Sequence, residues 1–177
     1  MTDNSLAHAT LGGGCFWCTE AAFKELDGVE SVTSGYAGGH VENPSYRAVC
    51  QGTTGHAEVI QIAYDPDTIS YVDLLEVFFT IHNPTTKDRE GPDVGSQYRS
   101  IVLYHDEKQR ELVEDFVYEL DQSDAYDDEI VTEIERLETF YGAEAKHQDY
   151  FEKNPQDAYC RMHAGPKVEK VRKQFAE

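Results

Sequence analysis

Apolar residues recur along the chain with two different periods, and each period predicts one kind of element. Alternating or β-branched runs predict strands at residues 7–11, 29–36, 57–64, 98–104 and 130–134. Apolar positions three and four apart predict helices after residue 18, from 71 to 81, around 112–120, at 144–152 and from 166 onward. Ser70 with Asp73 is a capping pattern for the second helix, and 40–56 and 85–97 are typical of loops.

The order of these elements predicts the fold. It is β-α-β-loop-β-α-β-α-β, which contains the duplicated split βαβ unit of the ferredoxin-like plait. We therefore expect an α+β fold, a two-layer ferredoxin-like α/β plait with a loop-rich C-terminal extension. The chain of 177 residues has no linker that would divide it. A single domain over residues 1–177 is expected, with the tail from about residue 140 wrapping the core.

The net charge limits the classes of partner. The chain has 34 Asp and Glu residues against 15 Lys and Arg, a net charge of −19, which repels nucleic-acid phosphates and anionic lipid. We expect no nucleic-acid and no membrane partner. No signal peptide or apolar membrane span is visible, so a cytoplasmic location is expected. The acidic excess also motivates the hypothesis of adaptation to high salt.

Residues 12–18, Gly-Gly-Gly-Cys-Phe-Trp-Cys, join the first strand to the first helix. A cysteine at a helix N-terminus meets free backbone N–H groups and the positive end of the helix dipole, which predicts a lowered pKa and a thiolate at Cys15. Cys18 completes a CxxC pair, and Phe16-Trp17 is expected to be exposed beside it. Four cysteines without a signal peptide favour redox or metal chemistry over structural disulfides.

Polar residues near the ends of strands supply a candidate acid. Glu58 opens an otherwise apolar strand, so burial is expected to raise its pKa and let it hold a proton near neutral pH. Tyr46 and Tyr98 are uncharged hydrogen-bond donors, and Asp93 can orient water or a tyrosine. A thiolate beside a protonated acid suits the reduction of a substrate whose oxygen leaves as water.

Six short motifs resemble, in order, those of the peptide methionine sulfoxide reductase A family. They are Gly14–Trp17 (GCFW), Gly35–Gly39 (GYAGG), Asn43–Arg47 (NPSYR), Thr54–Glu58 (TGHAE), Gly95–Ser100 (GSQYRS) and Ala158–Cys160 (AYC). The resemblance extends over nearly the whole chain. It implies reduction of the S epimer of methionine sulfoxide, free or in proteins, and so repair after oxidative damage. It also implies an α+β plait with a long C-terminal extension.

The resemblance implies a role for each matching residue. Cys15 matches the nucleophile that attacks the sulfoxide sulfur, and Glu58 the acid that protonates its oxygen. The remaining implied site residues are Tyr46 and Tyr98 as hydrogen-bonding partners, Asp93 as a supporting carboxylate, and Phe16 and Trp17 as the apolar wall for the substrate methyl. The reaction leaves a sulfenic acid on Cys15, which a second thiol converts to a disulfide.

Two cysteines are candidates for that second thiol. Cys160 matches the usual recycling cysteine of the family, whereas many relatives carry glycine where this chain has Cys18. Cys160 is favoured for the first disulfide, because a flexible tail can swing in and a CxxC pair must distort the helix start. Cys50 is interpreted as structural. The family hands its disulfide to thioredoxin and needs no cofactor or metal, and a monomer is expected.

Three other interpretations remain open at this stage. A thioredoxin-like disulfide oxidoreductase also uses CxxC at a helix entry, but gives Glu58 no role. A zinc enzyme is suggested by His56-Ala57-Glu58 with the cysteine pair, although the order differs from that of the zinc deaminases. A non-catalytic binding domain with a redox-sensing cysteine would not need so many convergent polar positions.

Overall fold

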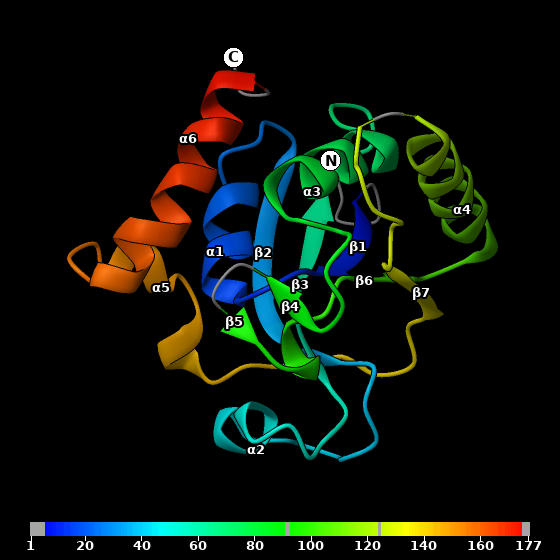
Figure 1. Ribbon diagram of the computed structural model, residues 1–177. Helices are drawn as coiled ribbons and strands as arrows, with labels where there is room; N and C mark the ends of the chain where they lie inside the picture. The colour runs from blue at the N-terminus through cyan, green and yellow to red at the C-terminus, as the bar shows by residue number, and fades with distance from the viewer. Residues whose placement is uncertain (1–5, 91–92, 124, 175–177) are drawn as a thin grey trace.

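A computed structural model describes residues 6–90, 93–123 and 125–174 (Figure 1). The strands are β1 (Ala7–Gly12), β2 (Val29–Ala37), β3 (Ala57–Tyr64), β4 (Arg89–Glu90), β5 (Asp93–Val94), β6 (Ile101–Tyr104), β7 (Glu133–Arg136) and β8 (Tyr141–Gly142). The helices are α1 (Phe16–Phe23), α2 (Tyr46–Cys50), α3 (Tyr71–Ile81), α4 (Glu107–Gln122), α5 (Tyr150–Lys153) and α6 (Gly165–Gln174).

The main sheet has the strand order β7-β6-β1-β3-β2-β8. Every neighbouring pair is antiparallel except β6 with β7, which is parallel. Helix α1 connects β1 to β2 and α3 connects β3 towards β6, so each crosses over one intervening strand. Strands β4 and β5 form a separate hairpin beside the sheet.

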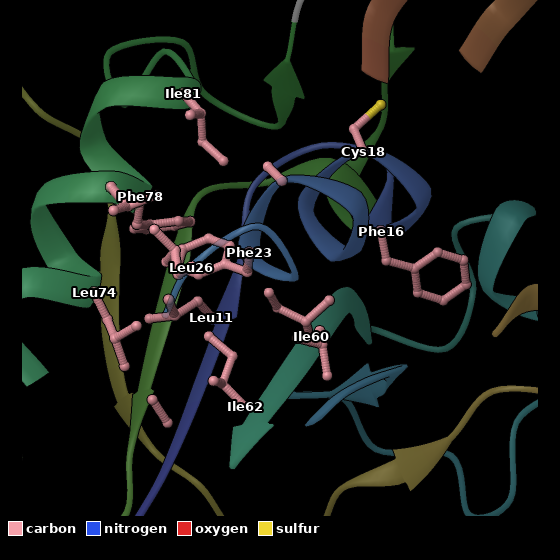
Figure 2. Close-up of a cluster of buried hydrophobic side chains, with 14 of the residues drawn as sticks. Leu11, Phe16, Cys18, Phe23, Leu26, Ile60, Ile62, Leu74, Phe78 and Ile81 are labelled. Carbon is pink, nitrogen blue, oxygen red and sulfur yellow. The ribbon is translucent and has the colours of Figure 1, made fainter. Parts of the chain in front are cut away.

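The two faces of the sheet are covered differently, because successive side chains on a strand point to opposite faces. Leu11, Ile60 and Ile62 face the helices, where they meet Phe23 of α1 and Phe78 of α3 in the main apolar cluster (Figure 2). The opposite face is covered by part of the segment between β7 and β8. There, the buried side chains of Val59, Ile101 and Leu103 pack against Leu137 and Phe140.

Helix α3 begins at the expected cap. The Asp73 N–H donates to Ser70 Oγ and the Ser70 N–H donates to Asp73 Oδ2, both at 3.0 Å, so two otherwise unpaired donors are satisfied. Its buried face contains Leu74, Leu75 and Phe78, as the apolar spacing predicts.

The C-terminal third differs most from the predicted elements. The helix expected at 144–152 is wrong: a 3₁₀ turn at Ala145–His147 and the short α5 replace it. Asp149 lies between them with φ +55°, a left-handed conformation that interrupts a helix. Beyond residue 159, a π-helical turn at Cys160–Ala164 leads directly into α6, which packs along α1 (Figure 1).

Smaller differences concern short elements near the site. The strand predicted from residue 98 begins at Ile101, because Ser96–Tyr98 forms a 3₁₀ turn. Helix α2 lies within the region expected to be irregular, and the β4–β5 hairpin lies within the expected loop. The strand predicted at 130–134 is β7, a few residues further on. None of the described helices is long and apolar enough to cross a bilayer.

Candidate active site

The glycine turn after β1 places Cys15 at the N-terminus of α1, as predicted. Cys15 is the N-cap residue, with φ −69° and ψ 131°. Gly14 has φ +85°, and a Cβ there would lie 2.6 Å from Cγ of Glu90. A Cβ on Gly13 would lie 2.8 Å from Cδ2 of His82. Only glycine fits at these two positions, because the backbone passes directly against other side chains.

The two cysteines of the CxxC pair share one hydrogen bond and are almost enclosed. Cys15 is 5% exposed and Cys18 is 2% exposed. The Cys15 thiol donates to the Cys18 sulfur, which lowers the pKa of Cys18 against the effect of its own burial. Burial raises the pKa of Cys15 well above its ordinary value, and the hydrogen bond to Cys18 and the charge of Glu58 act in the same direction.

The predicted lowering of the Cys15 pKa is therefore wrong for this state of the protein. A backbone N–H, that of Trp17, does favour the Cys15 thiolate, as expected at a helix start. Its effect is smaller than the cost of removing a charged sulfur from water. The two sulfurs titrate as a pair, and the first proton leaves more readily than the second.

Glu58 lies at the start of β3 and carries an unpaired carboxylate oxygen. Its Oε1 accepts the backbone N–H of Phe16 at 3.1 Å, and its side chain is 1% exposed. Oε2 has no hydrogen-bond partner among the described residues. Burial raises the pKa of Glu58 to about 8 despite the bond from Phe16, which confirms the expected direction. The group can hold a proton at neutral pH.

Tyr46 and Tyr98 both lie near this carboxyl group. Burial, followed by the negative charge of Glu58, raises the pKa of each phenol, so both remain protonated donors. The Tyr46 hydroxyl donates to the sulfur of Cys50. The carbonyl oxygen of Tyr98 accepts the Gly14 N–H at 3.1 Å, which ties its turn to the glycine turn. Cys50 thus touches a candidate site residue, which the loop interpretation missed.

Asp93 is engaged by the C-terminal extension. Its Oδ2 accepts a hydrogen bond from the hydroxyl of Tyr159. The same hydroxyl hydrogen bonds to the Cys18 sulfur. Tyr159 therefore connects β5 with the CxxC pair, a contact that no local sequence pattern indicates.

The aromatic wall is more enclosed than expected. Phe16 is fully buried, so the prediction of an exposed Phe-Trp pair is wrong for this residue, while Trp17 is half-buried. Trp17 stacks on Tyr150 with ring centroids 3.8 Å apart and planes 6° apart. Its indole N–H donates to Nδ1 of His147 at 3.2 Å, and the His147 ring lies 4.1 Å from that of Tyr46. Tyr150 is one of several aromatic residues in the tail, and no local pattern marks it or His147 as part of this wall.

Cys160 is fully buried in the π-helical turn rather than carried on a freely swinging tail. Burial raises its pKa to about 12, and the charges of Asp157 and Cys18 act in the same direction. Its backbone N–H donates to Asp157 Oδ1 at 3.1 Å. Among the other cysteines, Cys18 is the one whose charge acts on Cys160.

His56, which suggested a zinc site, has both ring nitrogens engaged in hydrogen bonds to the backbone. One ring nitrogen of His56 accepts the Gly39 N–H at 3.0 Å, and the other bonds to the Val41 carbonyl oxygen at 2.6 Å. Neither nitrogen is free to bind a metal ion. Within the described ranges, no group of three or more His, Cys, Asp or Glu side chains is arranged to hold one.

Comparisons with known proteins agree with one another. The family model described as "Peptide methionine sulfoxide reductase" matches residues 7–177. The peptide methionine sulfoxide reductase MsrA of Natronomonas pharaonis is 74% identical over 171 residues, 97% of this chain and 96% of that one. Mxr1 of Saccharomyces cerevisiae in reduced form has a TM-score of 0.78 and 35% identity, over 90% of this chain and 92% of that one. Mxr1 in complex with Trx2 has a TM-score of 0.55 and 26% identity, over 84% and 87%.

Proposed function

The chain belongs to the peptide methionine sulfoxide reductase A family, and from this we propose how its own residues reduce the S epimer of methionine sulfoxide. The observation that carries the proposal is the buried, proton-bearing carboxyl group of Glu58 beside the nucleophile position at the start of α1. Its oxygen Oε2 lacks a partner among the described residues, which suits a group waiting for the sulfoxide oxygen.

In the first step, Cys15 loses its thiol proton to solvent, which protonation of Glu58 favours because the Glu58 charge is one of the causes that raise the pKa of Cys15, and the thiolate attacks the sulfoxide sulfur. Glu58 gives its proton to the sulfoxide oxygen, while the hydroxyls of Tyr46 and Tyr98 donate hydrogen bonds to the same oxygen. The oxygen is transferred to the Cys15 sulfur, methionine leaves as the thioether, and Cys15 becomes a sulfenic acid. Phe16 and Trp17 receive the methyl group on the substrate sulfur, since sulfur-bound methyl groups pack well on aromatic rings.

In the second step, a thiol converts the sulfenic acid to a disulfide and releases water. The hydrogen bond between the Cys15 and Cys18 sulfurs supports Cys18 as the first partner, and the electrostatic interaction between Cys18 and Cys160 supports Cys160 as the next. This order differs from the sequence-based expectation, in which Cys160 forms the first disulfide. Thioredoxin then reduces the final disulfide, a role that the Mxr1 complex with Trx2 supports.

We also propose the finer features that accompany this function. The antiparallel order β6-β1-β3-β2, with α1 and α3 as crossovers, supports a ferredoxin-like plait. We propose one catalytic domain, a monomer without a cofactor or resident metal, and a cytoplasmic enzyme. Because Cys15 is only 5% exposed, the side chains around it have to move before a peptide can enter.

The test uses the reduced protein with dithiothreitol and a racemic sulfoxide of acetylated methionine. Chiral chromatography should show loss of half the sulfoxide, all of it the S epimer. Cys15→Ser should abolish the loss, and Cys160→Ser should keep one stoichiometric turnover with thioredoxin as reductant. An untouched racemate in the wild-type sample would reject the proposed function.

A further inference from the structure

One ion pair links the C-terminal helix to the nucleophile turn and is not used in the reaction above. Lys167 Nζ lies 3.2 Å from Glu90 Oε2, and the two side chains are only 17% and 13% exposed. Pairs this enclosed are screened less by water and salt than surface pairs. The other oxygen of this carboxylate, Glu90 Oε1, accepts the backbone N–H of Asn83 at 2.8 Å. Lys167 and the Asn83 backbone therefore hold the Glu90 carboxylate from two sides.

The pair lies beside the glycine turn that leads into the CxxC motif. The side chain of Glu90 lies directly over Gly14, the residue before Cys15. Lys167 lies in the first turn of α6, which packs along α1, and its positive charge acts on Cys18. In Figure 2 the Cys18 sulfur points away from the apolar cluster, towards the C-terminal ribbon. Cys15, Lys167, Asp93 and Tyr159 act most strongly on the pKa of Cys18, and the charge of Cys18 in turn acts on Glu58 and Cys160.

Lys167 is the cation among these four groups, while Asp93 is an anion that opposes a negative charge on Cys18. A nucleophilic sulfur needs to be a thiolate when the sulfenic acid forms. We propose that Lys167, held in place by Glu90, is a positioning residue that keeps Cys18 charged and so makes it the sulfur that attacks oxidised Cys15.

Lys167 supports the step in which Cys18 attacks the Cys15 sulfenic acid. The Cys18 thiolate forms an S–S bond with the Cys15 sulfur while the S–O bond of the sulfenic acid breaks. Cys18 is oxidised, the Cys15 sulfur is reduced, and the leaving hydroxide takes a proton from solvent to become water. This inference rests on the proposed function, but its first test does not.

The first test is a titration of thiolate absorbance at 240 nm in the fully reduced protein. The lowest midpoint is assigned to Cys18 by its loss in Cys18→Ser. Lys167→Met should raise that midpoint by about one unit, because the thiolate loses its cation and keeps Glu90 nearby. Glu90→Gln should lower it, because Lys167 is then no longer neutralised. Lys167→Arg should restore the wild-type midpoint, and all variants are first checked for unchanged far-ultraviolet circular dichroism.

Lys170→Met is the matched control. Lys170 lies one turn further along α6 and donates to the carbonyl oxygen of Thr80, away from the cysteines. Its loss should leave the midpoint unchanged. Opposite shifts in Lys167→Met and Glu90→Gln support the inference. Shifts in the same direction, no shift, or an equal shift in the control overturn it.

The second test is one turnover with an equivalent of the sulfoxide, quenched in acid and analysed by peptide mass spectrometry. In Lys167→Met the Cys15 sulfenic acid, trapped with dimedone, should persist about tenfold longer at pH 7, while methionine release stays unchanged. An unchanged sulfenic-acid lifetime would overturn the inference. If the wild type releases no methionine, the proposed function fails, and the absorbance titration still decides the role of Lys167.

Discussion

The proton on Glu58 and the charge on Cys15 are linked, because the Glu58 carboxylate raises the pKa of the neighbouring thiol. Protonated Glu58 removes that repulsion and also supplies the proton that the sulfoxide oxygen needs. One ionisation therefore serves both the nucleophile and the leaving oxygen.

This linkage predicts a basic limit on the first step. Burial raises the pKa of Glu58 to about 8, so the protonated fraction falls tenfold per unit above that pH. Because the pKa of Cys15 is higher still, methionine formation in a single turnover, followed by rapid acid quench, should rise with pH up to about 8 and then level off, as each further unit gains Cys15 thiolate but loses protonated Glu58. Glu58→Gln should let the rate keep rising above pH 8 and should slow the step by roughly 10²–10⁴-fold. A wild-type rate that keeps rising tenfold per unit to pH 9.5 would contradict this assignment.

Burial shifts the pKa of His82 in the opposite direction from that of Glu58. Its Nδ1 bonds to the Phe78 carbonyl oxygen at 2.5 Å and its Nε2 to Ser100 Oγ at 2.7 Å, beneath the Gly13 backbone. Burial lowers the pKa of His82 to about 4. The unfolded chain therefore binds a proton that the folded chain does not, at any pH between about 6.5 and 4.

Stability should consequently fall as the pH drops through this window. The contribution from His82 is about 3 kcal/mol, fully present above pH 6.5 and lost by pH 4. Urea unfolding at pH 7 and pH 4.5 measures the loss. In His82→Leu the protein should be less stable at pH 7, because Ser100 loses a partner, but the loss between the two pH values should shrink. An identical loss in both proteins would exclude His82 as the source.

Two helices, α2 and α3, begin with a serine N-cap, but loss of the cap is expected to affect activity in one case and stability in the other. Ser70 caps α3, whose packed face forms part of the core, and Ser45 Oγ accepts the Ala48 N–H at 3.1 Å to cap α2. Ser70→Ala should cost about 1 kcal/mol of unfolding free energy with full activity. Ser45→Ala should reduce activity more than stability, because the short α2 carries Tyr46. Chemical denaturation and initial rates on both variants separate the two effects.

Glu20 connects α1 to the aromatic wall. Its buried side chain accepts the Asp149 N–H at 2.8 Å and also a bond from the backbone of Tyr150, the residue stacked on Trp17. Glu20→Ala should loosen this stack, raise KM with little change in the first chemical step, and shift the fluorescence of Trp17, the single tryptophan. Unchanged emission would show that the stack does not depend on Glu20.

Elements with strong local patterns could be predicted from the sequence, and those held by distant contacts could not. The strand at 57–64 and the capped helix α3 contain enough periodic apolar residues to specify themselves. The turns around Asp149 and Cys160 depend on bonds to Glu20 and Asp157 and on packing against α1. No pattern within those short segments encodes such partners.

The same distinction applies to the site. The glycine turn and the buried Glu58 follow from local sequence, whereas the bonds of Tyr159 to Asp93 and to the Cys18 sulfur come from far along the chain. The helix terminus by itself lowers the pKa of Cys15, through the backbone N–H of Trp17, but burial outweighs this effect. No local pattern predicts that burial.

The whole molecule carries a net charge of −19, so its folded state contains considerable self-repulsion. Added KCl should therefore raise the melting temperature, most steeply at low ionic strength, where screening lengths are long. Thermal scans from 0.05 to 2 M KCl, with sucrose as a control for non-ionic solute effects, measure this. A constant or falling melting temperature would contradict both the screening argument and the proposed adaptation to high salt.

The outer strands of the sheet, β7 and β8, leave few backbone groups free to pair with another chain. β7 has the sequence Glu-Ile-Glu-Arg and β8 only two residues, and beside β8 the Gln148 side-chain amide bonds to both the N–H and the carbonyl oxygen of Ser34, at 2.9 and 2.8 Å. Short, charged or already occupied borders discourage the addition of a foreign strand. A repair enzyme meets damaged polypeptides whose own strands are exposed. This molecule offers them little free backbone on which to aggregate.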